Sequence, residues 1–106
     1  MNDKVKVVLA QLRHYLEALY GEQLDQVVLY GSQARGDAKP DSDIDVLIVL
    51  KQPVDSSAEI ERTGEFTSHL CLENNVLISR TFTSIAQFKY ETGGFFRNVR
   101  REGIAV

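Results

Sequence analysis

The sequence has little cysteine and lacks a long apolar run. With one cysteine, Cys71, among 106 residues, neither a disulfide framework nor a cysteine-based zinc site can form within the chain. This usage is typical of a reducing, cytoplasmic setting. The longest apolar run, residues 46–50, is far too short to cross a bilayer, and the polar first residues lack the apolar core of a signal peptide. We therefore expect no membrane association.

The sequence also lacks an excess of basic residues. The formal net charge is −3, which argues against a protein that coats nucleic acid, so we expect no direct nucleic-acid binding. A chain of 106 residues predicts one domain, residues 1–106, with room for one core. A missing substrate-binding wall would then come from a partner or from a second copy.

Hydrophobic periodicity predicts an α/β domain. Apolar residues recur at helical spacing over residues 3–20, and short β-branched or apolar runs predict strands at 26–30, 44–50 and 75–82. A second helix is expected over 56–72, a short helix capped by Ser84 over 85–91, and a last helical turn or two over 95–101. The inward side chains of the second helix are expected to be Ile60, Thr63, Thr67, Leu70 and Cys71. This order predicts a small mixed β-sheet flanked by helices.

Two aspartates interrupt the apolar pattern of the strand at 44–50. Asp45 lies within it and Asp43 two residues earlier, so both side chains should point to the same side. Like charges repel, and burying an unpaired carboxylate costs roughly several kcal/mol. A cation would offset both effects, and hard oxygen ligands with open positions suit Mg²⁺ completed by substrate phosphates. The alternative is a turn acid followed by a strand-edge acid.

A glycine and a serine follow the strand at 26–30. Gly31 would let a phosphate approach the backbone closely, and Ser32 could cap the following turn and donate to a phosphate oxygen. Arg35 adds a permanently charged planar donor to the same loop, although it could also be a solvated loop arginine. The sequence thus predicts that phosphates and metal-binding carboxylates meet at one end of two adjacent strands.

Together these residues match a known signature. Gly31-Ser32, ten intervening residues and Asp43-Ile44-Asp45 resemble the DNA polymerase beta nucleotidyltransferase superfamily, and residues 31–36 with 42–45 look like its minimal nucleotidyltransferase (MNT) branch. The ending at residues 96–103 is also similar to small members of that branch. The resemblance extends over nearly the whole chain and implies the palm-like core of the superfamily.

The resemblance also implies an activity and a partner. The activity is transfer of AMP from ATP to a hydroxyl, with Asp43 and Asp45 holding Mg²⁺ and the Gly31-Ser32 loop holding the triphosphate. Many minimal members pair with a HEPN-type toxin encoded nearby and act as its antitoxin by adenylylating one of its tyrosines. A hetero-oligomer with such a toxin is therefore expected.

One position departs from the superfamily pattern, which usually has a third carboxylate on the third strand. The matching residue is expected to be Asn75, which cannot accept the proton of an attacking hydroxyl. Glu73 has the same parity if the strand already begins there, so it is a second candidate metal ligand or base. Either residue could instead be an ordinary surface or loop residue.

Two other functions stay open. In one, the protein is a weak or inactive enzyme that neutralises the toxin by covering it. In the other, ranked lower, it is a small-molecule adenylyltransferase, a class that usually carries an added helical domain. Residues 95–101 hold two phenylalanines and three arginines. The arginines could form a solvated helix face or contact an acidic partner or the nucleotide phosphates, and the two phenylalanines beside them favour a partner interface.

Overall fold

The computed structural model describes residues 1–106 and is built on a four-stranded sheet with strand order β3-β2-β1-β4. The strands are β1 (Leu24–Tyr30), β2 (Ile44–Leu50), β3 (Ile78–Ser84) and β4 (Ile104–Ala105). β2 runs antiparallel to β1 and parallel to β3, while β4 runs antiparallel to β1. The sheet is therefore mixed, as the sequence predicts.

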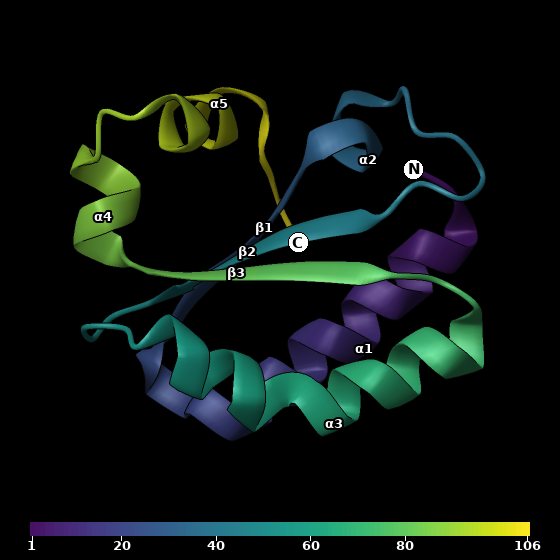
Figure 1. Cartoon of the computed structure of the whole chain (residues 1–106), viewed down its shortest axis with the longest axis horizontal. Helices are drawn as coiled ribbons and strands as arrows, with labels where there is room; N and C mark the ends of the chain where they lie inside the picture. The colour runs from purple at the N-terminus through teal and green to yellow at the C-terminus, as the bar shows by residue number, and fades with distance from the viewer.

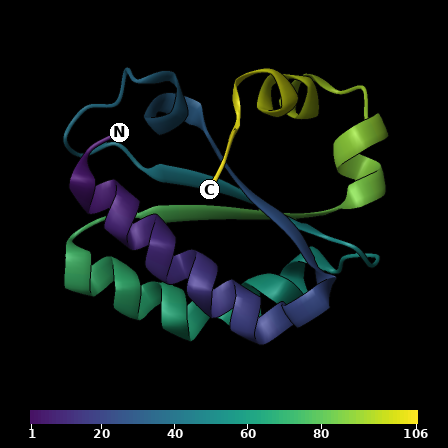
Figure 2. The ribbon, with the colours of Figure 1, turned by 180° about the vertical axis from the view of Figure 1, so that it is seen from behind.

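Long helices cover one face of the sheet and short helices the other (Figure 1). The long helices are α1 (Asp3–Tyr20) and α3 (Ser56–Asn74), and the 3-10 turn Gly21–Gln23 joins α1 to β1. The short helices are α2 (Gly31–Arg35), α4 (Ile85–Tyr90) and α5 (Gly94–Glu102). The view from behind shows the same two layers, with α2 and α5 above the sheet (Figure 2). None of the helices combines the length and the apolar character that crossing a membrane requires.

Three helices begin at side-chain caps that satisfy free backbone N–H groups. Asn2 accepts a 2.8 Å hydrogen bond from the N–H of Val5 at the start of α1. Asp55 accepts one from the N–H of Ala58 at the start of α3. Ser84 caps α4 within a capping box, which confirms the cap expected from the sequence.

The central strand β2 sends side chains into two apolar clusters. Six of its seven residues are buried, and Asp45 is the exception. Ile44, Val46, Ile48 and Leu50 join α1 and α3 in the larger cluster. Leu47 and Val49 join Val28 of β1 and Val99 of α5 in the smaller one. Because side chains alternate along a strand, Asp45 lies on the face covered by the short helices.

Several element boundaries differ from those expected. The third strand begins at Ile78 and not at residue 75, because α3 continues to Asn74 and ends in a left-handed residue, Asn75. Residues 31–35 form a short helix where a turn was expected, and β4 was not foreseen. α1 and β2 match the predicted 3–20 and 44–50.

The inward face of α3 also differs from the prediction. Thr63, Thr67 and Leu70 are buried as expected, but Ile60 is exposed and Cys71 is only half-buried. Glu59 takes the inward place. The carboxylate of Glu59 faces α1, where the hydroxyl of Tyr20 donates a hydrogen bond to it.

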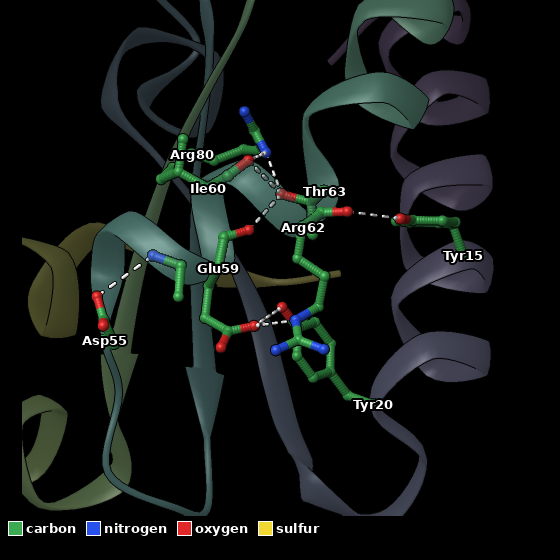
Figure 3. Close-up of polar contacts among 9 residues, drawn as sticks. Tyr15, Tyr20, Asp55, Glu59, Ile60, Arg62, Thr63 and Arg80 are labelled. Carbon is green, nitrogen blue, oxygen red and sulfur yellow. Dashed lines mark hydrogen bonds and ion pairs between the residues drawn. The ribbon is translucent and has the colours of Figure 1, made fainter.

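Glu59 lies at the centre of a polar contact between α1 and α3 (Figure 3). Its Oε1 accepts a 2.5 Å hydrogen bond from the hydroxyl of Tyr20 and a 3.1 Å bond from Nε of Arg62. Burial, and then the hydrogen bond with Glu59, raise the pKa of Tyr20 above its ordinary value, so the hydroxyl stays a donor.

Arg80 enters the same region from the edge strand β3 (Figure 3). Its Nη1 donates to Oγ1 of Thr63 and, at 3.3 Å, to the carbonyl oxygen of Ile60. Its Nε is buried without a hydrogen-bond partner in the chain, and burial lowers the pKa of the guanidinium. An inward-pointing charge on an edge strand disfavours pairing with a foreign strand.

Candidate active site

Asp43 and Asp45 lie where β2 begins. Asp43 precedes the strand and is exposed, whereas Asp45 is half-buried and pairs in register with Tyr30 of β1 and Ser79 of β3. Burial, followed by the negative charge of Asp43, raises the pKa of Asp45. The two carboxylates are thus close enough to interact electrostatically. Neither accepts a hydrogen bond from a group of this chain.

Gly31 contacts Asp45 so closely that no larger residue fits. A Cβ atom built on Gly31 would overlap Oδ2 of Asp45, and the φ angle of +72° is one that L side chains rarely adopt. The first residue of α2 therefore packs its backbone against the carboxylate. This contact joins the glycine-serine loop to the aspartate pair, 14 residues later in the chain.

Ser32 lies in the first turn of α2 and is not its capping residue. The N-cap is Tyr30, which makes no side-chain cap, so the expected capping role of Ser32 is wrong. The helix ends at Gly36 in the left-handed conformation, where the Gly36 N–H donates to the carbonyl oxygen of Ser32. The Ser32 side chain is half-buried beside Gly31 and makes no hydrogen bond within the chain.

Arg35 lies at the end of α2 and is exposed. Its Nε is 3.3 Å from Oδ2 of Asp37, and its Nη1 is 3.3 Å from Oε1 of Glu102 in α5. The hydrogen bond and the charge of Asp37 raise the pKa of Arg35. The positive charge of Arg35 in turn lowers the pKa of Asp45, but burial raises it by more. Arg35 therefore belongs to the electrostatic surroundings of Asp45 and links α2 to α5.

Neither predicted third position lies on β3. Asn75 caps the end of α3, and its carbonyl oxygen lies 3.5 Å from Nζ of Lys4. Glu73 is a residue of α3 that lines a groove of about 560 Å³ between α1 and α3, so the condition for its role, a strand that already begins at Glu73, is not met. The β3 residue beside Asp45 in the register is Ser79.

Hydroxyl groups therefore occupy the third-strand side of the site. Ser79 lies beside Asp45, and Thr81 follows two residues later on the same face, where its Oγ1 is 3.4 Å from the hydroxyl of Tyr30. Neither hydroxyl is a base near neutral pH. Sequence reasoning missed Ser79 because the register of β3 against β2 is not visible in a single sequence. Tyr30 had a visible signal, its place directly before Gly31.

The side chains of the site can be compared with the ligands that a hard cation such as Mg²⁺ requires. No group of three or more His, Cys, Asp or Glu side chains gathers anywhere in the chain in a metal-binding arrangement. Asp43 and Asp45 nevertheless supply carboxylate oxygens that are free of protein partners, and burial disfavours the charged form of Asp45. Two oxygen ligands with open positions fit Mg²⁺, which is commonly bound by one or two carboxylates together with phosphates.

The mixed sheet thus carries a carboxylate pair where β2 begins and the Gly31-Ser32 start of α2 where the neighbouring β1 ends. The family model "Nucleotidyltransferase domain" matches residues 9–92. The chain is 32% identical over 72 residues to a Methanocaldococcus jannaschii protein named "Putative protein adenylyltransferase MJ0141", covering 68% of this chain and 72% of the relative. The chain therefore belongs to the nucleotidyltransferase domain family, and it is a nucleotidyltransferase.

Solved structures share the fold. The crystal structure of a toxin-antitoxin with AMP-PNP superposes with a TM-score of 0.62 and 16% identity, covering 98% of this chain and 72% of that chain. A tri-AMPylated Shewanella oneidensis HEPN toxin in complex with MNT antitoxin gives a TM-score of 0.56 and 14% identity, covering 94% and 69%. The MNT-like fold and the family resemblance expected from the sequence are confirmed.

Proposed function

We propose that the protein transfers AMP from ATP to a hydroxyl of a protein partner in a Mg²⁺-dependent reaction. The carrying observation is the contact between the Gly31 backbone and the Asp45 carboxylate. It puts the loop suited to phosphates directly beside the carboxylates suited to a cation. The M. jannaschii relative is named a protein adenylyltransferase, which agrees with AMP as the transferred group.

Asp43 and Asp45 would hold the magnesium ion. Both carboxylates lack hydrogen-bond donors from the chain, and burial, followed by the negative charge of Asp43, raises the pKa of Asp45. Bound Mg²⁺ would polarise the phosphoryl oxygens and stabilise negative charge on the leaving pyrophosphate. We propose no third protein ligand, because Ser79 is the β3 neighbour of Asp45.

The triphosphate would bind at Gly31 and Ser32. Gly31 has no side chain to block the approach of a phosphate, and the Ser32 hydroxyl is free to donate to a phosphate oxygen. Arg35 would add a charged donor after leaving Asp37 and Glu102. Ion pairs made by an exposed arginine contribute little to stability, so exchanging them for a phosphate costs little.

Deprotonation of the acceptor has no evident protein base. Ser79 and Thr81 cannot accept a proton at neutral pH, and Glu73 lies in the groove between α1 and α3. A positioned base normally contributes about 10²–10⁴-fold in rate. We therefore expect slow transfer, with a tyrosine favoured as acceptor because its hydroxyl is more acidic than that of serine.

The proposed partner is a HEPN-type toxin, and the protein would be its antitoxin. Support comes from the fold shared with an MNT antitoxin whose crystal structure contains a tri-AMPylated HEPN toxin. On α5, Arg97 is exposed and Arg101 bonds only to Asn98 within its own helix, so both are available to an acidic partner. Arg100 is not available, because it donates to the carbonyl oxygens of Phe88 and Glu91.

The test is AMP transfer followed by intact mass. The protein is incubated with ATP, Mg²⁺ and the product of the neighbouring gene. We expect a gain of AMP on the partner, lost on chelation of the metal and reduced by at least about 100-fold in Asp45→Asn, since a metal typically supplies several kcal/mol of transition-state stabilisation. Asp41→Asn is the matched control, an exposed acid of the same loop. Equal rates in both variants would contradict the proposed site.

The second candidate is a binding module that silences its partner by covering it. The absence of a carboxylate beside Asp45 on β3 is the observation that favours it. Ser79→Asp separates the two functions: it should accelerate transfer by about tenfold or more if the wild type is a slow enzyme, whereas Asn75→Asp should change nothing. If the wild type and Ser79→Asp are both inert but bind the partner tightly, the binding module is correct.

A further inference from the structure

Three aromatic rings form a continuous ladder that starts at the candidate active site. Tyr30 pairs in register with Asp45 and directly precedes Gly31. The ring of Phe95 meets the Tyr30 ring edge to face, with centroids 5.4 Å apart, and the ring of Phe96 meets that of Phe95 at 5.2 Å. The aromatic ladder (Tyr30, Phe95 and Phe96) thus runs from β1 onto the first turn of α5.

The core explains Tyr30, which packs against the smaller apolar cluster, but not the two phenylalanines. The residue of α5 that enters the smaller apolar cluster is Val99, and neither phenylalanine belongs to that cluster. Phe95 is 43% exposed and lies at the start of α5, a helix with several charged residues. A single exposed ring is ordinary on a protein surface. An exposed ring that packs edge to face against two other rings, one of them beside Asp45 in the register, is a more specific arrangement.

The ladder lies on the face of the sheet that carries Asp45, the face on which we propose that the triphosphate binds. α2 and α5 lie side by side on the face of the sheet that carries Asp45, and the ion pair of Arg35 with Glu102 joins them (Figures 1 and 2). A triphosphate at Gly31-Ser32 and Asp45 leaves the nucleoside free to extend over the same face. Of the groups next to Asp45 in the register, Ser79 is small and polar, and Tyr30 offers the beginning of an apolar wall.

We propose that the aromatic ladder is the nucleobase-binding wall of this enzyme and that it favours purines. This inference rests on the proposed function, which supplies the position of the triphosphate. Every base has a π-face that stacks on an aromatic side chain, and the contribution depends on ring overlap. Neighbouring rings of the ladder are close to perpendicular, so the base would stack on a single exposed ring, that of Phe95. A purine, with two fused rings, overlaps more of that ring than a pyrimidine does. Selectivity therefore follows from the size of the base.

Calorimetry with three Mg²⁺-bound ligands tests the wall. ATP, UTP and inorganic tripolyphosphate share the triphosphate, but only the first two have a base. We expect Phe95→Ala to weaken ATP binding by about tenfold, in line with the usual loss of a stacked base, and UTP binding by less. Tripolyphosphate binding should stay within about twofold of wild type. Phe95→Leu keeps an apolar side chain without a π-face and should behave like the alanine variant, whereas Phe95→Trp should keep the affinity for ATP.

Tyr90→Ala is the matched control, because Tyr90 is an exposed aromatic residue on α4 that contacts no other ring. It should bind all three ligands like wild type. The wall is refuted if Phe95→Leu binds ATP normally, or if Phe95→Ala weakens tripolyphosphate as much as ATP, which would signal a disturbed loop. A wild type that binds neither tripolyphosphate nor ATP would overturn the proposed function and the wall with it. A wild type that binds both, with Phe95→Ala unaffected, would overturn the wall alone.

Discussion

At the scale of single residues, the site depends on the fit between Gly31 and Asp45. Two glycines of the same segment, Gly31 and Gly36, have positive φ angles of +72° and +84°, but their surroundings differ. A Cβ on Gly31 would overlap the Asp45 carboxylate, whereas a Cβ on Gly36 would meet nothing within 4 Å. The two positions therefore separate the cost of backbone conformation from the cost of the contact.

Gly31→Ala should be much more damaging than Gly36→Ala. Both variants carry the left-handed penalty of about 1–2 kcal/mol, and only Gly31→Ala must also displace the carboxylate. Urea denaturation should report the larger loss of stability for Gly31→Ala. Calorimetry should report weaker binding of Mg²⁺ and ATP, by at least about tenfold (roughly 1.4 kcal/mol), for that variant alone. Equal ligand affinities in the two variants would show that the contact does not position the carboxylate.

The raised pKa of Asp45 predicts a pH dependence of stability. The native state holds the Asp45 proton more tightly than the unfolded chain, because burial and then the charge of Asp43 disfavour the carboxylate. The contribution of the protonated Asp45 to the free energy of unfolding should therefore be fully present below the ordinary aspartate pKa. It should be lost as the pH rises through the raised pKa of the native state. We expect Asp45→Asn to remove this fall in metal-free protein.

Chemical denaturation from about pH 4 to about pH 8, in the presence of a chelator, measures the effect. Asp41→Asn is again the control, since it should reproduce the wild-type profile. Added Mg²⁺ should raise the stability of the wild type at neutral pH but not that of Asp45→Asn. Parallel profiles for wild type and Asp45→Asn would mean that the carboxylate is not strained in the native state.

At the scale of elements, the packing of α3 against α1 includes a polar contact. Glu59 is buried, and its Oε1 accepts from Tyr20 of α1 and from Arg62 of α3. The sequence pattern favoured Ile60 as the inward residue, because an apolar side chain is the usual choice. The structure instead satisfies a buried carboxylate with two donors, which lowers the cost of its burial.

Glu59→Ala should destabilise the protein by about 2 kcal/mol, because it leaves the half-buried Tyr20 hydroxyl without its acceptor. The control is Glu61→Ala, an exposed position on the same helix with the same change in helix propensity. Guanidinium denaturation of both variants gives the comparison. If the two variants lose equal stability, the Tyr20–Glu59 bond does not contribute to the α1–α3 packing.

At the scale of the whole molecule, one sheet serves two apolar clusters. The larger cluster lies under α1 and α3 and the smaller one under α4 and α5, and alternate residues of β2 belong to each. Losing either cluster removes support from the same strand. The two helical layers should therefore unfold together in one cooperative transition.

Mg²⁺ and ATP together should raise the melting temperature of the wild type as a single transition. At a hundred times the dissociation constant, a ligand stabilises by about 2.7 kcal/mol, which for a domain of this size corresponds to about 10 °C or more. Scanning calorimetry with ATP alone, Mg²⁺ alone and both gives the measurement. A shift with ATP alone that equals the shift with both would argue against the metal-dependent site.

Local signals in the sequence were strong where one face of an element is apolar. The bounds of α1 and β2 were predicted correctly because helical spacing and an unbroken apolar strand do not depend on partners. The mixed sheet and the nucleotidyltransferase family were also accessible from the sequence, since Gly31-Ser32 and Asp43-Ile44-Asp45 keep their pattern in the chain itself.

Tertiary contacts decided the rest. β3 is a polar edge strand, and its start at Ile78 follows from pairing with β2, so Asn75 and Glu73 fell outside the strand and Ser79 came to lie beside Asp45. The two-residue strand β4 exists only because β1 offers it an edge. Periodicity records which face of an element is buried. It does not record which residue of another element lies opposite, because that choice is made by register and packing through space.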